Sequence, residues 1–119
     1  MKKPSKKTLR NKLDRICSEL VRKRGKCERC SKKNSLQAAH IFSRTYNNTR
    51  WGLENILCLC ASCHFWAHKN PILFAEFVKK ILGGEKYELL KEARNQITKY
   101  TLQDLETKYH ILQEIKEGK

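Results

Sequence analysis

Cysteine and histidine are concentrated in the segment "CLCASCHFWAH", residues 58–68, which holds three cysteines and two histidines. Cys60 and Cys63 form a Cys-x-x-Cys pair, and a second such pair, Cys27 and Cys30, ends 29 residues before it. Two pairs of this kind supply the four thiolates of a tetrahedral structural zinc site. In a chain that we expect to be intracellular, thiols stay reduced, so six cysteines indicate metal rather than disulfides. We therefore predict one structural Zn²⁺ bound by these four cysteines.

The histidines of the same segment, His64 and His68, lie four residues apart on a predicted helix, so their rings share one face. Such a pair can hold one metal ion, and it can also lie in a core or on a surface without one. Cys63 and His64 are adjacent and point about 100° apart around a helix, so we expect them to serve different ions. We expect Cys17 and Cys58 to be small buried side chains rather than ligands.

Two more residues extend the pattern: His40 lies in a predicted strand, and Asn55 lies just before the next one. The stretch "LQAAHIFSRTYNNTRWGLENILCLCASCHFWAH" resembles the HNH endonuclease motif, a strand–loop–strand–helix unit also called ββα-metal. The spacings from His40 to Asn55, His64 and His68 are similar to those of nuclease colicins. Over roughly residues 8–115 the chain is closer still to the NinG (Rap) family of lambdoid-phage recombination endonucleases, through "TLRNKLDRICSELVR", "LQAAHIFSR", "TRWGLENILCLCASC" and "KNP".

The resemblance implies metal-dependent hydrolysis of DNA phosphodiester bonds that leaves 5′-phosphate and 3′-hydroxyl ends. His40 would be the general base, which suits an imidazole that is neutral near pH 7. His64 and His68 would hold a catalytic divalent ion, Mg²⁺, Mn²⁺, Ni²⁺ or Zn²⁺. Asn55 would fasten the loop across the two strands or orient His40. Arg44, in the loop after His40, could stabilise charge on the phosphate.

Two positions depart from the family patterns. Many HNH enzymes carry a metal-binding acid or histidine where this chain has Ala39, although NinG-type chains also tend to have a small residue there. This leaves two protein ligands for the catalytic ion, and Gln37 lies on the same strand face as Ala39 and could help. NinG-type chains usually have asparagine where this chain has His64. Imidazole ligands suit Zn, Ni, Mn or Co better than Mg.

Three functions remain open on the sequence alone. If the NinG likeness holds, the substrates are branched recombination intermediates such as Holliday junctions, and the two cuts that a junction needs favour a homodimer. The second reading is a nicking or homing-type HNH endonuclease that cuts one sequence. The third is a non-catalytic zinc-knuckle DNA-binding module, with Ala39 as a sign of lost activity.

The charge supports a nucleic-acid partner. The formal net charge is +14, and residues 1–33 contribute +11 of it. Such an excess indicates a polyanion partner, for which DNA is the leading candidate, although a solubilising basic tail would look the same. The candidate DNA contacts lie on the first predicted helix and in the loop after His40: Arg10, Lys12, Arg15, Arg22, Lys23, Arg44 and Arg50.

The elements that must position these residues follow from hydrophobic periodicity. We predict a helix from a Ser5 or Thr8 cap to about Arg24, strands over 36–42 and 56–59 joined by a polar loop, and helices over about 61–69, 71–82, 85–98 and 102–116. The fold class is α+β, mainly helical, in three regions: a basic helix (1–26), a zinc-stapled ββα-metal core (27–69) and a helical region (70–119). The start of the chain lacks the apolar stretch of a signal peptide and no membrane span is expected, so the protein should be cytoplasmic, in a bacterial host if phage-encoded.

Overall fold

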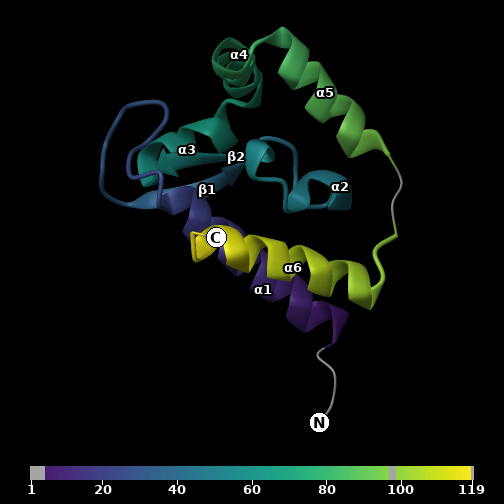
Figure 1. Cartoon of the computed structure of the whole chain (residues 1–119). Coiled ribbons are helices and arrows are strands. Elements are labelled where there is room, and N and C mark those ends of the chain that lie inside the picture. The colour runs from purple at the N-terminus through teal and green to yellow at the C-terminus, as the bar shows by residue number, and fades with distance from the viewer. Residues whose placement is uncertain (1–4, 97–98, 119) are drawn as a thin grey trace.

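A computed structural model describes residues 5–96 and 99–118, and shows a mainly helical α+β domain built on one two-stranded hairpin (Figure 1). The predicted helical positions 97 and 98, and residues 1–4 and 119, lie outside the described residues. A short 3₁₀ helix (Leu53–Asn55) precedes the second strand. The helices and strands are α1 (Lys6–Arg22), β1 (Leu36–His40), α2 (Asn47–Arg50), β2 (Ile56–Cys60), α3 (Ala61–Lys69), α4 (Pro71–Leu82), α5 (Gly84–Asn95) and α6 (Leu102–Lys116).

Helix α1 begins at Ser5, one of the two predicted caps, whose hydroxyl accepts from the backbone N–H of Thr8. Its apolar residues recur at helical spacing and are buried. After the helix ends, Gly25 adopts a φ of +88°, which favours glycine because other side chains rarely enter that region. The chain then turns into the segment that carries the first cysteine pair.

The hairpin pairs β1 with β2 in antiparallel register, with His40 opposite Ile56 and Leu36 opposite Cys60. Every residue of β2 is buried, because helices cover both faces of this short sheet. Strand β1 has β2 as its partner along one edge, and its other edge has no strand partner among the described residues. Residues 36–41, at that second edge, line a large cavity.

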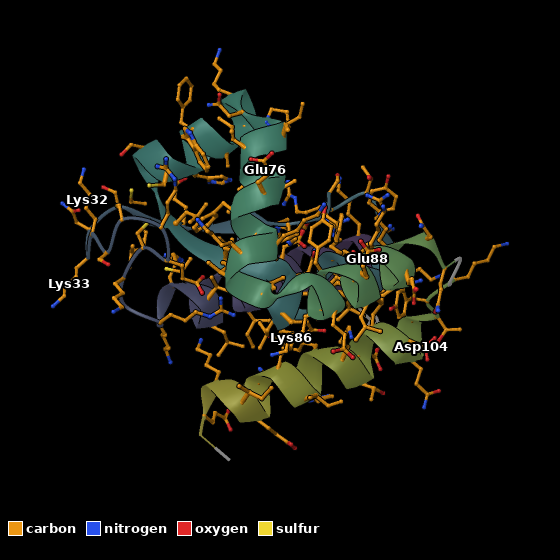
Figure 2. The ribbon with its side chains drawn as sticks, turned by 90° about the horizontal axis from the view of Figure 1, so that it is seen from above. Lys32, Lys33, Glu76, Lys86, Glu88 and Asp104 are labelled. Atoms are coloured by element: carbon orange, nitrogen blue, oxygen red, sulfur yellow. The ribbon has the colours of Figure 1, made fainter. Side chains whose placement is uncertain are left out.

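Two hydrophobic clusters hold the hairpin from its two faces. The first cluster joins α1 to α6, which runs alongside it in the same direction (Figure 1), and includes Cys17 and Cys58. The predicted burial of those two thiols is therefore confirmed. The second cluster joins the hairpin to α3 and α4 and contains Val78. Seen from above (Figure 2), Lys32 and Lys33 project away from the body, on the segment that follows the first cysteine pair.

Helix α6 opens with a capping box, in which Thr101 and Asp104 each accept a hydrogen bond from the other's backbone N–H. Its buried residues Leu105 and Leu112 pack against α1, so the last helix and the first share one core. Over residues 5–96 and 99–118, every helix is too short or too polar to cross a lipid bilayer.

Candidate metal and catalytic site

The four predicted cysteine ligands come together. The Sγ atoms of Cys27, Cys30, Cys60 and Cys63 all lie within 4.8 Å of one another, and those of Cys30 and Cys60 are 3.6 Å apart. A tetrahedral ion with Zn–S bonds of about 2.3 Å places its sulfurs roughly 3.8 Å apart. The spacing in the cluster therefore fits one tetrahedral metal ion, and the four thiols could hold it.

Local structure explains why the cluster assembles from two separate pairs. Cys60 ends β2 and Cys63 lies in the first turn of α3, so the strand-to-helix junction presents one pair. Cys27 and Cys30 form the other pair in a turn whose Ser31 has a φ of +67° and donates its N–H to the Cys27 carbonyl. Glu28 fastens this turn to β2, because its carboxylate accepts from the Cys58 N–H at 2.6 Å and its own N–H donates to the Cys58 carbonyl.

The electrostatics of the cluster favour a cation. The backbone N–H of Cys63 lowers the pKa of the Cys60 thiol to about 6, whereas burial raises the pKa of Cys63 to about 12. Four thiolates gathered this closely repel one another unless a cation neutralises them. Arg29 stacks 3.6 Å from the centroid of the Trp66 ring and donates to the Cys63 sulfur at 3.5 Å, which places positive charge against the cluster.

His64 and His68 form a second group of potential ligands on the next turns of α3. Their Nε2 atoms are 3.2 Å apart, and two imidazoles bound tetrahedrally to one ion at about 2.1 Å would be roughly 3.4 Å apart. Gln37 accepts from His64 Nδ1 at 2.8 Å, so the lone pair of His64 lies on Nε2 and points toward His68. Gln37 therefore orients His64 through this hydrogen bond, whereas the sequence suggested that Gln37 could help to bind the ion.

No third His, Cys, Asp or Glu side chain in the part of the chain that the structure describes lies close enough to share an ion with His64 and His68. Among the described residues, the four-cysteine cluster is the group of three or more His, Cys, Asp or Glu side chains that could share an ion. Ala39 is buried at the position where a ligand would be expected. Any ion at His64 and His68 would thus have two imidazole ligands from this chain.

Asn55 is fully buried and ties the loop across the two strands. Its Oδ1 accepts from the Phe42 N–H, and its Nδ2 donates to the carbonyls of Phe42 and Thr49, each at 3.0 Å. Its own carbonyl accepts from the Ile41 N–H at 2.7 Å. Of the two roles expected for Asn55, fastening the loop matches these contacts, and no contact of its amide with His40 is present.

Asn55→Ala should therefore destabilise the protein by about 3 kcal/mol, because it leaves several buried backbone groups without partners. Asn47→Ala, at an exposed position in the same loop region, should change the stability by less than about 0.5 kcal/mol. The shift in the urea midpoint measures both values. Equal effects of the two substitutions would contradict the fastening role.

His40, at the end of β1, is half-buried and has its orientation fixed by the loop. Its Nε2 donates to the backbone carbonyl of Arg50 at 2.9 Å. A carbonyl can only accept, so in the neutral ring the other nitrogen, Nδ1, is left as a proton acceptor. Burial lowers the pKa of His40 below its ordinary value of 6.5, although the hydrogen bond to Arg50 opposes this.

Asp14 of α1 was not expected in the site from the sequence. It accepts from Arg50 Nε at 3.0 Å, from Arg50 Nη2 at 2.6 Å and from Trp51 Nε1 at 2.9 Å. Burial would raise the pKa of Asp14, but the hydrogen bonds from Arg50 and Trp51 outweigh it and lower the pKa. An acid on a strongly basic helix, which α1 also has at Glu19, was the only signal of this role. Trp51 is itself buried.

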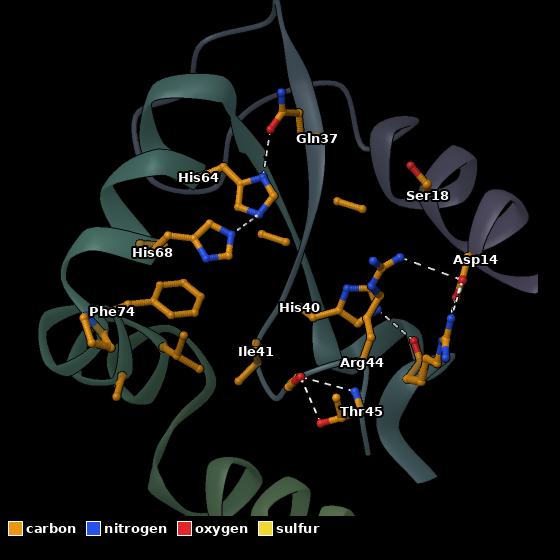
Figure 3. A pocket seen from close by; sticks show the side chains of 18 of the residues that line it. Asp14, Ser18, Gln37, His40, Ile41, Arg44, Thr45, His64, His68 and Phe74 are labelled. Carbon is orange, nitrogen blue, oxygen red and sulfur yellow. Dashed lines mark hydrogen bonds and ion pairs between the residues drawn. The ribbon is translucent and has the colours of Figure 1, made fainter. Parts of the chain in front are cut away.

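Asp14, His40, His64 and His68 all line one cavity of about 1180 Å³. This cavity runs along the unpaired edge of β1. All six residues from 36 to 41 line it in succession. In Figure 3, His64 and His68 lie on one side of β1, and His40 and Arg44 lie on the other. The cavity therefore brings the histidine pair and His40 to the same space from opposite faces of the hairpin.

The predicted DNA contacts divide among different surfaces. Arg22 and Arg44 line the cavity, and the Arg44 side chain is 60% exposed at 3.8 Å from Asp14. Arg50 also lines it, but its guanidinium is engaged by Asp14 and is 21% exposed. The other candidates lie outside the cavity: Lys12 and Arg15 on α1 beside α6, Arg10 also on α1, and Lys23 directly after its last residue.

Comparisons with known proteins identified no relative of the chain. A scan against protein-family models, a search of curated proteins and a search of solved structures each found no match to the chain.

Proposed function

We propose that the protein is a metal-dependent endonuclease that hydrolyses DNA phosphodiester bonds. The observation that carries the proposal is the cavity along β1, in which an oriented, half-buried histidine meets a pair of histidines whose Nε2 atoms lie 3.2 Å apart. A general base and an ion-binding pair facing one space are the two components that metal-assisted hydrolysis needs. The HNH likeness of the sequence gives the same roles to His40, His64 and His68.

His40 acts as the base through Nδ1, since Nε2 is engaged by the Arg50 carbonyl. It takes a proton from the water that attacks phosphorus, which leaves a 5′-phosphate and a 3′-hydroxyl end. A divalent ion held by His64 and His68 would supply Lewis-acid stabilisation of the phosphate charge and of the leaving oxygen. Gln37 keeps His64 in the tautomer that can bind such an ion.

Arg44 is the arginine best placed to contact the substrate phosphate, because it is exposed and lines the cavity beside His40. Arg50 is a weaker candidate, since Asp14 already neutralises its charge. The net charge of +14 supports an anionic polymer as the partner. Branched recombination intermediates are the proposed substrates, from the sequence likeness to NinG-type enzymes, and a homodimer would supply the two cuts.

Structural zinc at the four cysteines is part of the proposal. The thiol geometry and the adjacent guanidinium of Arg29 fit a tetrahedral ion with a net negative ligand set. This ion would fix the junction between β2 and α3, and through it the direction in which His64 and His68 point. It has no expected part in the chemistry.

The test is a cleavage panel with purified protein. Supercoiled plasmid, a synthetic four-way junction, a flap and linear duplex are each incubated with Mg²⁺, Mn²⁺, Ni²⁺ or Zn²⁺. We expect cleavage of at least one substrate, with preference for the junction, and dependence on the added metal. DNA binding without cleavage under every metal would contradict the enzyme and support the zinc-knuckle binding module. Cuts at one repeated sequence would support a nicking enzyme instead.

The pH dependence should reflect the lowered pKa of His40. The base must be neutral to accept a proton, so the acidic midpoint of kcat/KM should lie below pH 6.5, with a decline of roughly tenfold per pH unit beneath the midpoint. The measurement is kcat/KM from pH 5 to 9 with metal saturating at each pH. An acidic midpoint above 7 would contradict His40 as the base in this environment.

A further inference from the structure

The loop between the strands is fastened to α1 at the carboxylate of Asp14. Two nitrogens of the Arg50 guanidinium donate to the two carboxylate oxygens at 3.0 and 2.6 Å, and the indole N–H of Trp51 donates to Oδ1 at 2.9 Å. A bidentate guanidinium–carboxylate pair is strong and also directional. Since Trp51 is buried and Asp14 is largely shielded, these bonds hold the loop in one place.

The peptide unit between Arg50 and Trp51 is the one that orients His40. Its carbonyl oxygen, which belongs to Arg50, accepts from His40 Nε2 at 2.9 Å. The side chains of Arg50 and Trp51, on either side of this peptide, both donate hydrogen bonds to the Asp14 carboxylate. Fixing both flanking side chains fixes the direction of the carbonyl, and the carbonyl in turn decides which imidazole nitrogen carries the proton.

We propose that Asp14 is a positioning residue of the nuclease centre: by holding the side chains of Arg50 and Trp51, it fixes the backbone carbonyl that accepts the hydrogen bond from His40 Nε2–H. The inference rests on the proposed function of His40 as the base. Asp14 touches neither substrate nor metal in this scheme, and its effect reaches the chemistry only through Arg50 and His40.

The same contacts assign different roles to the two loop arginines. Asp14 pairs with Arg50 at 2.6 Å and reaches Arg44 only at 3.8 Å, so Arg44 keeps its charge available for a phosphate. Removing the Asp14 charge would leave the cavity more positive. Binding of DNA would then be unchanged or tighter, whereas the rate would fall.

The test compares Asp14→Asn with Glu19→Gln in the full chain. Glu19 is a matched control, because it lies on the same helix and forms an equally short ion pair of 2.6 Å, with Lys116 of α6. Asp14→Asn should lower kcat by about 10- to 100-fold, as expected when a catalytic group is misplaced by about 1 Å, without raising KM. Glu19→Gln should change neither parameter by more than about twofold.

A double-mutant cycle with Arg50→Gln shows whether Asp14 acts through Arg50. The double variant should be no slower than the slower single variant, because both substitutions break one linkage. Arg50→Gln also tests the proposal by itself if Asp14→Asn fails to fold. A kcat of Asp14→Asn within twofold of wild type, or fully additive losses in the cycle, would overturn the proposal.

Nitrogen-15 NMR of the histidine rings gives a readout that needs no activity. His40 should carry its proton on Nε2 in the wild type and in Glu19→Gln, and should populate both tautomers in Asp14→Asn. An unchanged His40 tautomer in Asp14→Asn would overturn the positioning role even if the rate fell. If the wild type cuts no substrate, the proposed function fails, and the NMR result still decides whether Asp14 orients His40.

Discussion

Replacing His40 with alanine should lower the cleavage rate by about 10²- to 10⁴-fold, the range that a positioned general base contributes. The effect should be on kcat rather than KM, because His40 contacts the attacking water rather than the DNA backbone. The ring is only half-buried and its side-chain hydrogen bond goes to the Arg50 carbonyl, so the fold should survive the change. Initial rates on the best substrate of the panel measure the loss.

Two further variants separate proton transfer from loop support. His40→Gln can still donate to the Arg50 carbonyl but has no basic nitrogen, so it should be as slow as His40→Ala. His110→Ala removes an exposed histidine of α6 and should leave the rate unchanged. If His40→Gln kept wild-type activity, the role of His40 would be structural and the proposed mechanism would be wrong.

Cysteine spacing and hydrophobic periodicity predicted most of the fold. Paired Cys-x-x-Cys motifs predict a cluster of thiols. The two pairs must lie close together if all four thiols are to bind one ion. The start of α1 was marked by local chemistry, the Ser5 cap. The mainly helical α+β class, the antiparallel hairpin and the four-cysteine cluster are all present in the structure.

The loop between the strands could not be predicted in the same way. It was expected to be irregular, but it contains α2 and a 3₁₀ turn, because Asn55 and Asp14 organise it through contacts distant in sequence. In the sequence, the acidic residues among residues 1–33 only reduced the positive charge of that segment. In the structure Asp14, Glu19 and Glu28 join this segment to the loop, to α6 and to β2.

The cavity also could not be predicted from the sequence. Strand alternation places His40 on one face of β1 and Gln37 with Ala39 on the other, so alternation alone would separate the proposed base from the proposed ligands. The two faces meet only because β1 is an edge strand, so that its unpaired side opens into the cavity. Edge position is a property of the assembled sheet rather than of any local pattern.

Removal of the metal from the four cysteines should unfold the hairpin and α3. Structural zinc contributes on the order of 10 kcal/mol to the folding of small domains, and a domain of this size has a total stability of about 5–15 kcal/mol. Loss of the ion therefore removes most or all of the margin. Cys60→Ser should reproduce the effect of a chelator, because Cys60 joins β2 to α3 and lies against Cys30 at 3.6 Å.

Cys58→Ala is the matched control, since Cys58 lies two residues away on the same strand, is equally buried, and belongs to the α1–α6 cluster instead. It should cost about 0.5–3 kcal/mol and leave the bound zinc at its wild-type level. Thermal unfolding followed by circular dichroism, with zinc measured by mass spectrometry, distinguishes the two variants. A chelated protein or a Cys60→Ser variant that kept the wild-type Tm would show that the four thiols hold no structural ion, and the orientation of His64 and His68 would then depend on the packing of α3 against α4 and the hairpin and on the Gln37 hydrogen bond.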